Sequence, residues 1–320
     1  MIRKYRVAII GAGNIAARFD ESESKAILTH AHAYSLHPGF KICGFVDLDE
    51  EKARFAALRW EGRAYSSIPK LVDKERPEII SVCTPDETHE NVVKQLEGKN
   101  ILGGILEKPL AVDLVGARAI ATSPLVKKGK FLMNYSRLFV PEFQKLRRDY
   151  RKGVYGRLVS ATGYYGKGLI HNGSHMISLL FWLFEGIKVI KKISLINDFT
   201  NDDPSVSAVL QFSAGAKGVL HAIDSRLHTI FELDLLFEKG RVRMVDSGHK
   251  LEVYELEKSK RYLGYTAMNP KEVITTSLGR SLSFAVENLY HWLEGSQPPL
   301  STVQEAFNVQ KICQDIILSK

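Results

Sequence analysis

Cysteine is scarce in this sequence, and long hydrophobic runs are missing from it. Cys43, Cys83 and Cys313 are far apart and form no CxxC pair, which argues against a disulfide framework and against a cysteine zinc site. The N-terminus has neither the apolar core nor the cleavage site of a secretory signal. The most apolar stretch, residues 176–184, is too short to cross a bilayer. We therefore expect a cytoplasmic protein without a membrane segment.

Signatures of nucleic-acid binding are also missing. The chain carries a net charge of +8, but its basic residues are scattered, with neither a zinc-finger spacing nor a basic patch interleaved with aromatic residues. Short clusters such as residues 127–130 are interpreted as solvated helix faces. A positive field still concentrates anionic small molecules. We expect a small-molecule ligand and no nucleic acid.

The 320 residues, of which 45% are hydrophobic and 25% charged, indicate a globular chain of about two domains. In the first third, strand-like runs alternate with helical segments, which predicts a parallel sheet covered by helices. The strand-like runs are residues 5–10, 41–46, 78–83 and 101–106, and the helical segments are residues 15–19, 49–60, 67–74 and 87–96.

The pattern changes after about residue 123. Strand-like segments are now joined mostly by turns, which predicts a second, more antiparallel sheet. These segments are residues 157–165, 206–212, 217–223, 230–237 and 250–256, and residues 281–293 and 303–318 are expected as closing helices. The predicted fold class is α/β, with a doubly wound parallel sheet in residues 1–123 and a second domain in residues 124–320.

A glycine-rich turn follows the first predicted strand. Gly11 permits the tight turn, Gly13 lets a pyrophosphate approach backbone N–H groups, and Ala16 permits close packing of the next helix. Asp47, which ends the second strand, can accept hydrogen bonds from a ribose. Its distance from the glycines exceeds the usual separation of about 20 residues, and the polar stretch 20–25 is interpreted as an inserted loop. The alternative is an ordinary βα turn without a ligand.

Asp47 also bears on the choice of dinucleotide. Its negative charge repels a 2′-phosphate, and Leu48 offers no cation to receive one, so NAD is favoured over NADP. Lys52 and Arg54 are near enough in sequence to keep NADP as the alternative.

A lysine follows the fourth predicted strand in the run Glu107-Lys108-Pro109. The carboxyl edge of an open α/β sheet is where ligands bind. Pro109 ends the strand and pushes Lys108 toward an extended backbone. An ammonium placed there can stabilise an emerging alkoxide. Taken alone, this run would be interpreted as an ordinary surface lysine.

Four motifs occur in order along the chain: residues 11–16, Cys83-Thr84-Pro85 with His89, Glu107-Lys108-Pro109, and Gly173-x-His175. Together they resemble the glucose-fructose oxidoreductase, inositol dehydrogenase and rhizopine catabolism family (Gfo/Idh/MocA), over nearly the whole chain. The resemblance implies an N-terminal Rossmann domain and a C-terminal substrate-binding α/β domain with an open-faced sheet. It also implies a homo-oligomer assembled through that sheet. The cofactor-binding residues that follow are Gly11, Gly13, Asn14, Ile15, Ala16, Asp47, Thr84, Pro85, His89, Glu107 and Lys108.

The resemblance further implies NAD(P)-dependent oxidation or reduction of sugars, cyclitols or their derivatives. The family's lysine corresponds to Lys108 and its histidine base to His175. The family often has aspartate four residues before that histidine, where this chain has His171, and an acid three residues after it, where this chain has Ser178. A neutral imidazole accepts through only one nitrogen, so substrate contacts or the pH response are expected to differ. Candidate substrate-binding residues are Asn134, Arg137, Tyr164, Tyr165, His171 and Asn172.

The expected reaction is reversible hydride transfer between nicotinamide C4 and a carbinol carbon. His175 takes the hydroxyl proton while Lys108 orients the oxygen. The positive net charge favours an acidic or nucleotide-linked sugar. Three alternatives stay open: a non-catalytic NAD-binding sugar sensor or scaffold, an NAD-assisted glycoside hydrolase, and a structural role for His171 in the core. A zinc pair of His171 and His175 is disfavoured by the glycine between them and by the missing H-E-x-x-H glutamate, so no metal is expected.

Overall fold

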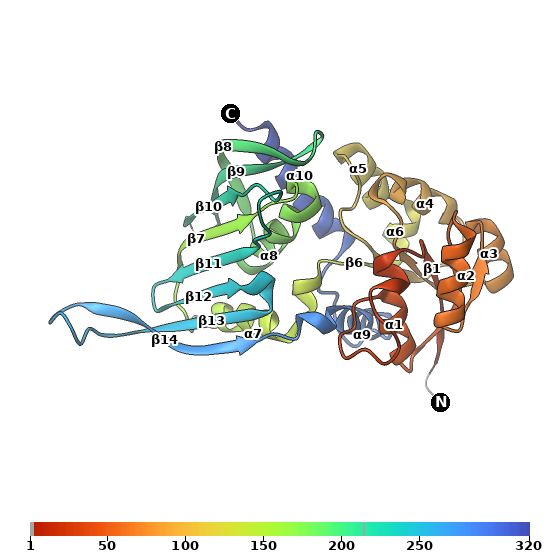
Figure 1. Cartoon of the computed structure of the whole chain (residues 1–320), viewed down its shortest axis with the longest axis horizontal. Coiled ribbons are helices and arrows are strands. Elements are labelled where there is room, and N and C mark those ends of the chain that lie inside the picture. Colours follow the sequence, from red (N-terminus) through yellow and green to blue (C-terminus); the bar gives the residue numbers. More distant parts are fainter. Residues whose placement is uncertain (1–2, 214) are drawn as a thin grey trace. The chain divides into compact units, whose positions relative to one another are not determined.

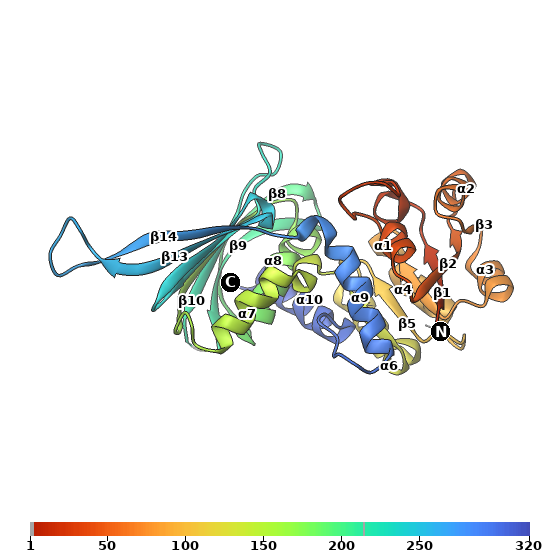
Figure 2. The same ribbon diagram turned by 90° about the horizontal axis from the view of Figure 1, so that it is seen from below.

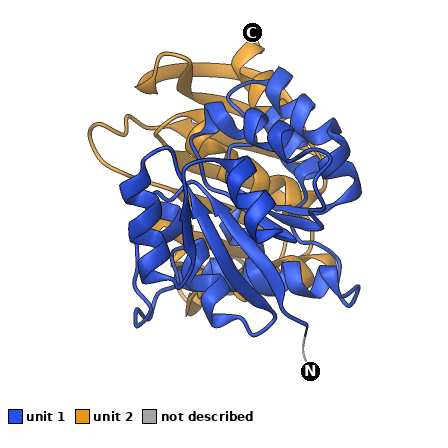
Figure 3. Ribbon diagram, turned by 90° about the vertical axis from the view of Figure 1, so that its right-hand side faces the viewer, with its two compact units in different colours: residues 1–139, 279–310 blue, residues 140–278, 311–320 orange. Residues whose placement is uncertain are grey.

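The computed structural model describes residues 3–213 and 215–320 and divides the chain into two compact units. Unit 1 comprises Met1–Phe139 and Gly279–Gln310, and unit 2 comprises Val140–Leu278 and Lys311–Lys320 (Figure 3). The sequence predicts a boundary at residues 123/124, whereas the units divide after Phe139. The reason is that the segment after residue 123 adds a strand to the first sheet, and the helix over Ser281–Leu293 packs on that strand.

The sheet of unit 1 has six strands, all parallel, in the order β3-β2-β1-β4-β5-β6. The strands are β1 (Tyr5–Ile10), β2 (Phe40–Val46), β3 (Arg63–Tyr65), β4 (Ile79–Val82), β5 (Gly103–Leu106) and β6 (Lys130–Met133). The strand order reverses between β1 and β4, the place where doubly wound sheets bind ligands. The predicted Rossmann architecture is confirmed, although β3 and β6 were not foreseen.

Helices cover both faces of this sheet, as its buried strands require. They are α1 (His30–Leu36), α2 (Glu50–Arg59), α3 (Ile68–Glu75), α4 (His89–Leu96), α5 (Leu114–Thr122), α6 (Pro124–Lys128) and α9 (Ser281–Leu293). Short turns of helix lie at η1 (Asn14–Arg18), η2 (Asp86–Thr88) and η3 (Ser136–Phe139). Side-chain caps begin several helices: Asp49 accepts the N–H groups of Glu51 and Lys52 at the start of α2.

The sheet of unit 2 has eight strands in the order β14-β13-β12-β11-β7-β10-β9-β8 (Figure 1). Every pairing is antiparallel except β7 with β10, so the predicted second, largely antiparallel sheet is confirmed. The strands are β7 (Leu158–Tyr165), β8 (Ile187–Thr200), β9 (Asp203–Phe212), β10 (Lys217–Ala222), β11 (Glu232–Phe237), β12 (Gly240–Val245), β13 (Lys250–Lys258) and β14 (Thr266–Thr275).

Helices pack on one face of the second sheet. These are α7 (Pro141–Arg151) and α8 (Ser174–Phe184), which lie on the same side of the sheet in Figure 2. Phe184 of α8 contacts the rings of Phe212 and Phe237, and Tyr150 of α7 also contacts Phe237. The turn η4 (Leu169–Gly173) leads into α8, and α10 (Val303–Leu318) closes the chain. Within the described ranges, no helix combines the length and the hydropathy that a bilayer crossing requires.

Candidate functional site

A pocket of about 720 Å³ lies in unit 1 where the strand order reverses. Its walls come from the turn after β1, the end of β2, the start of α3, the segment after β4 and the first turns of α4. The predicted dinucleotide residues Gly11, Gly13, Asp47, Thr84 and Pro85 all line it. Segments far apart in the sequence therefore meet at this one edge of the parallel sheet.

The two glycines of the turn have different reasons to be glycine. Gly11 has a φ of +87°, and a Cβ there would lie 2.7 Å from the carbonyl carbon of Cys83. Gly13 has an ordinary φ of −75°, and a Cβ there would meet no atom within 4 Å. The space beside Gly13 opens into the pocket, as a pyrophosphate contact requires. Ala16 is fully buried in η1, as expected for the close-packing position.

Asp47 ties the glycine turn to the end of β2. Its Oδ2 accepts the N–H of Ala12 at 2.7 Å, and its Oδ1 accepts the N–H of Asp49 at 2.9 Å. The long separation in sequence between the glycines and Asp47 is taken up by a loop and by α1, which follows the polar stretch 20–25. Of the two nearby cations, Lys52 lines the pocket, and Arg54 is paired with Glu50.

The segment after β4, which lines the pocket, contains a buried polar atom without a partner among the described residues. Thr84 Oγ1 is buried and has no hydrogen-bond partner among the described residues. His89 is fully buried behind this segment, with Nε2 3.0 Å from the carbonyl oxygen of Thr84 and Nδ1 3.1 Å from that of Pro109. The structure thus places His89 as a brace between two loops of the sheet edge and not in the wall of the pocket.

Glu107 and Lys108 follow β5 at the same sheet edge. The Glu107 Oε1 atom accepts hydrogen bonds from His30 Nε2 at 2.8 Å and from Asn134 Nδ2 at 2.5 Å. Burial alone would raise the pKa of Glu107, but these two hydrogen bonds and the nearby His30 and Lys108 hold that pKa below its usual value. Lys108 is half-buried, and its peptide bond to Pro109 is cis. Sequence reasoning missed His30, because its partner is 77 residues away.

Two of the predicted substrate-binding residues belong to unit 1. Asn134 follows β6 directly and is buried, and its Oδ1 has no partner among the described residues. Arg137 lies in η3, where burial lowers the pKa of its guanidinium to about 10, so it remains protonated at neutral pH.

His171, Asn172 and His175 are brought together in unit 2 by η4 and the first turn of α8. The Asp203 carboxylate accepts the N–H groups of Ile170 at 2.7 Å and of His171 at 2.8 Å. Burial raises the pKa of Asp203 although these hydrogen bonds oppose the rise. The His171 ring stacks on Phe199 with ring centroids 4.5 Å apart. The sequence offered no signal for Asp203, since it lies in β9, and only the strand order β7-β10-β9 brings it to this turn.

The two predicted tyrosines, Tyr164 and Tyr165, point to opposite faces of β7. Tyr165 is 0% exposed, and its hydroxyl donates to the carbonyl of Val206 and accepts the N–H of the same residue. Tyr164 points to the opposite face, because a Cβ on the preceding Gly163 would touch Met176 of α8. On that open face Tyr164 stacks on His221 at 5.2 Å. The burial and the hydrogen bonds of Tyr165 leave its hydroxyl no room for a substrate, whereas Tyr164 is partly exposed.

Clusters of three or more His, Cys, Asp or Glu side chains suited to a metal do not occur in residues 3–213 and 215–320. The three cysteines are free and buried.

Comparison with known proteins adds two findings at the level of sequence. Residues 5–135 match the model of an oxidoreductase family with an NAD-binding Rossmann fold, GFO_IDH_MocA. The rhizopine catabolism protein MocA of Rhizobium meliloti is 29% identical over 197 residues, which are 56% of this chain. The match spans 57% of the length of that relative.

Solved structures share the fold over the whole chain. The WlbA dehydrogenase from Bordetella pertussis, in complex with NADH and UDP-GlcNAcA, is 16% identical with a TM-score of 0.77, covering 98% of this chain and 96% of its own. A 3-ketoreductase mutant from Actinomadura kijaniata, in complex with TDP-benzene and NADP, is 14% identical with a TM-score of 0.77, covering 99% and 98%. The UDP-N-acetylglucosamine 3-dehydrogenase GnnA from Acidithiobacillus ferrooxidans is 15% identical with a TM-score of 0.73, covering 98% and 96%.

Proposed function

Because this chain belongs to the Gfo/Idh/MocA family of NAD-binding Rossmann oxidoreductases, we propose that it is an NAD(P)-dependent dehydrogenase or reductase. Its substrate is a CH–OH group of a sugar, a cyclitol or a sugar derivative. The observation that carries the proposal is the pocket of unit 1, which joins the glycine turn, Asp47 and the unpartnered hydroxyl of Thr84 at one sheet edge. The Glu107-Lys108 segment follows the adjacent strand.

The residues present fit the dinucleotide. The open space beside Gly13 suits a pyrophosphate held by backbone N–H groups, and the Asp47 carboxylate suits the hydroxyls of a ribose. Thr84 Oγ1 supplies a further hydrogen bond to a ligand in the pocket. When bound, NAD(P) supplies the hydride acceptor or donor, chemistry that no side chain provides.

Two side chains handle the oxygen and its proton. In the direction of oxidation, His175 takes the hydroxyl proton onto an imidazole nitrogen, because histidine side chains are effective general bases at neutral pH. The Lys108 ammonium donates a hydrogen bond to the same oxygen and stabilises its developing charge. Asn134, Arg137, His171 and Asn172 are proposed to bind substrate.

We propose NAD over NADP as the cofactor. The Asp47 charge lies at the pocket wall, where it disfavours a 2′-phosphate. Lys52 in the same wall is the cation through which NADP would bind instead. A nucleotide-linked or acidic sugar is the proposed substrate, which is consistent with the net charge of +8 and with the nucleotide-sugar names of two of the fold neighbours.

The further proposals concern the cellular location, the oligomeric state and the binding partners of the protein. Three free cysteines fit a reducing compartment, and we propose the cytoplasm. We also propose a homo-oligomer that assembles through the face of the second sheet opposite α8, and a small-molecule substrate without nucleic-acid or membrane partners.

The test is a screen of NADH formation, read by absorbance at about 340 nm, against sugars, inositols, uronic acids and nucleotide sugars. For the best substrate, Lys108→Met and His175→Ala are each expected to lower kcat by at least about a hundredfold. NADH binding, measured by fluorescence titration, should persist in both. Retained turnover in both variants would refute the assigned roles. NADH binding without turnover on any substrate would favour a sensor, and free sugar released without net NADH would favour a hydrolase.

A further inference from the structure

A chain of buried polar groups lies behind Glu107 in unit 1. The Tyr34 hydroxyl is 3.1 Å from Ser81 Oγ, which is 3.0 Å from His30 Nδ1. His30 Nε2 is 2.8 Å from Glu107 Oε1, which also accepts the amide of Asn134. His30, Ser81 and Tyr34 are all 0% exposed. This series of hydrogen bonds therefore runs from the core to the sheet edge that carries Lys108.

Tyr34, at the buried end of this series of hydrogen bonds, decides whether His30 relays protons or holds Glu107 in place. A carboxylate only accepts hydrogen bonds, so His30 donates to Glu107 through Nε2. A proton relay would need an exit to solvent at the other end. Tyr34 is fully buried, and burial raises the pKa of its hydroxyl well above the usual value. The arrangement thus holds Glu107 in place and does not conduct protons.

His30, His89 and Gln310 all contact the segment that contains Lys108, in which the N–H of Glu107 also donates to the carbonyl of Val82. His30 holds the side chain of Glu107, and His89 contacts the carbonyl oxygen of Pro109. Gln310 donates to the carbonyl of Ala111 at 2.6 Å and accepts its N–H at 3.3 Å. Of His30, His89 and Gln310, only His30 contacts the charged side chain of Glu107, which precedes Lys108.

Asn134 gains its orientation from the same carboxylate. Its amide must turn the NH₂ group toward the Glu107 anion, because the amide oxygen would be repelled there. The Oδ1 atom is then left buried without a partner in the described part of the chain. A hydrogen-bond acceptor is thereby aimed away from Glu107 and is available to a ligand hydroxyl or N–H.

We propose that His30 is a positioning residue, which holds the Glu107 carboxylate and through it orients both the Asn134 amide and the main chain that carries Lys108. This inference rests on the proposed hydride-transfer function. It extends that function to a residue that lies outside the pocket and was assigned no role by its sequence position.

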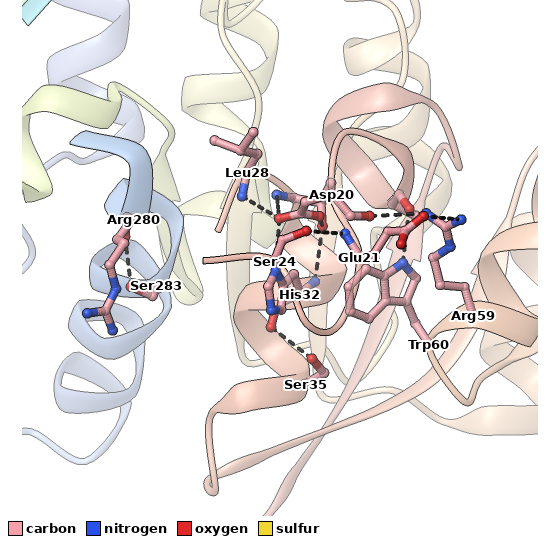
Figure 4. A network of polar contacts seen from close by, with 12 residues as sticks. Asp20, Glu21, Ser24, Leu28, His32, Ser35, Arg59, Trp60, Arg280 and Ser283 are labelled. Carbon is pink, nitrogen blue, oxygen red and sulfur yellow. Dashed lines mark hydrogen bonds and ion pairs between the residues drawn. The ribbon is translucent and has the colours of Figure 1, made fainter. Parts of the chain in front are cut away.

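The chain offers a matched control two residues along the same helix. His32 is also a buried histidine, and its Nδ1 lies 2.9 Å from a carboxylate oxygen of Asp20, with both side chains 1% exposed. Figure 4 shows His32 directed toward Asp20 and the Trp60 ring. The other hydrogen bonds of the Asp20 carboxylate come from Leu28 and Thr29. A substitution of His32 therefore removes a comparable buried histidine–carboxylate pair and leaves the contacts of Glu107 unchanged.

The experiment compares His30→Leu, His30→Gln and His32→Leu in the full chain. For the substrate found by the screen, His30→Leu is expected to lower kcat by roughly ten- to a hundredfold, with a smaller change in KM. The NADH dissociation constant should stay as in the wild type. His30→Gln keeps an amide donor for Glu107 and should recover most of the loss. His32→Leu should lower the thermal midpoint similarly yet leave kcat unchanged.

Hydrogen exchange, measured for individual peptides by mass spectrometry, provides a second test that does not depend on activity. His30→Leu should speed exchange in residues 103–113, and His32→Leu should instead speed exchange in residues 20–29. Equal losses of kcat in His30→Leu and His32→Leu, or no recovery in His30→Gln, would overturn the proposal. If the wild type neither binds NADH nor turns over, the proposed function fails by itself. Unchanged exchange in residues 103–113 of His30→Leu would then overturn the positioning role, and faster exchange there would support it.

Discussion

At the scale of single residues, the two glycines of the turn after β1 differ in their backbone conformation and surroundings. Gly11 is required by its backbone conformation and by the close approach of Cys83, whereas Gly13 has an ordinary φ and open space around it. The fold therefore explains the first glycine, and the proposed dinucleotide explains the second.

Gly13→Ala is expected to leave the free energy of unfolding within about 0.5 kcal/mol of the wild type. Because the added methyl group occupies the space beside the pyrophosphate, NADH affinity should fall at least about tenfold. Gly11→Ala, by contrast, should destabilise the protein by about 2 kcal/mol or more. Urea denaturation and NADH fluorescence titration measure the two effects. Wild-type NADH affinity in Gly13→Ala would contradict this account of the turn.

Asp47→Asn tests the choice of cofactor. The variant keeps an oxygen for the N–H of Ala12, and it loses the charge together with the second oxygen, which accepts the N–H of Asp49. We expect the ratio of the NADPH to the NADH dissociation constant to fall by about tenfold. Glu51→Gln is the control, because it removes an exposed charge close by, whereas Asp49 is paired with Lys52. A ratio that changes equally in both variants would mean that Asp47 has no specific role in discrimination.

At the scale of elements, the turn η4 is held by a carboxylate from another strand. Asp203 accepts two consecutive backbone N–H groups at the start of this turn. The pairing of β9 with β10, and of β10 with β7, brings that carboxylate to the turn that follows β7. The segment that carries His171 and His175 is thus oriented by strand pairing as well as by its own helix.

Asp203 should make stability depend on pH. Its pKa is raised in the fold, so between about pH 4 and the higher folded value the native state binds the additional proton. The free energy of unfolding therefore falls as pH rises through that window. Asp203→Asn should flatten this fall in urea denaturation measured across mildly acid pH. Asp202→Asn, which changes the exposed neighbouring carboxylate, should retain it. An unchanged slope in Asp203→Asn would refute the assignment.

At the scale of the whole molecule, the second sheet has one face that helices leave uncovered in the described chain. Tyr164 lies on this face in β7, near the middle of the strand order, and is 36% exposed. Neighbouring strands add the ion pairs of Arg241 with Asp234 and of Arg243 with Glu252. A mixed aromatic and charged face of this kind suits a self-complementary contact between two copies.

Tyr164→Asp is expected to lower the particle mass measured by light scattering, because it places an unpaired charge in the proposed contact. NADH binding should persist, since the pocket belongs to unit 1. Leu58→Asp serves as the control, because Leu58 is 87% exposed on α2. An unchanged mass in Tyr164→Asp would argue against assembly through this face.

The sequence by itself determined the fold class, the glycine turn, Asp47 and the position of Lys108 after β5. These features are local: strand and helix periodicity, glycine spacing and the residue at a strand end can each be recognised within a short window. The two closing helices were also predicted with the bounds that the structure shows, because their apolar periodicity is regular.

Only the tertiary structure decided what depends on distant partners. It brought His30 to Glu107 and Asp203 to the turn before His175, and it returned α9 to the first unit. It also placed Tyr164 on the open face of the second sheet and paired the hydroxyl of Tyr165 with the backbone of Val206. The physical reason is that hydrogen bonds and packing act over a few ångströms in space, whatever the separation of their partners along the chain.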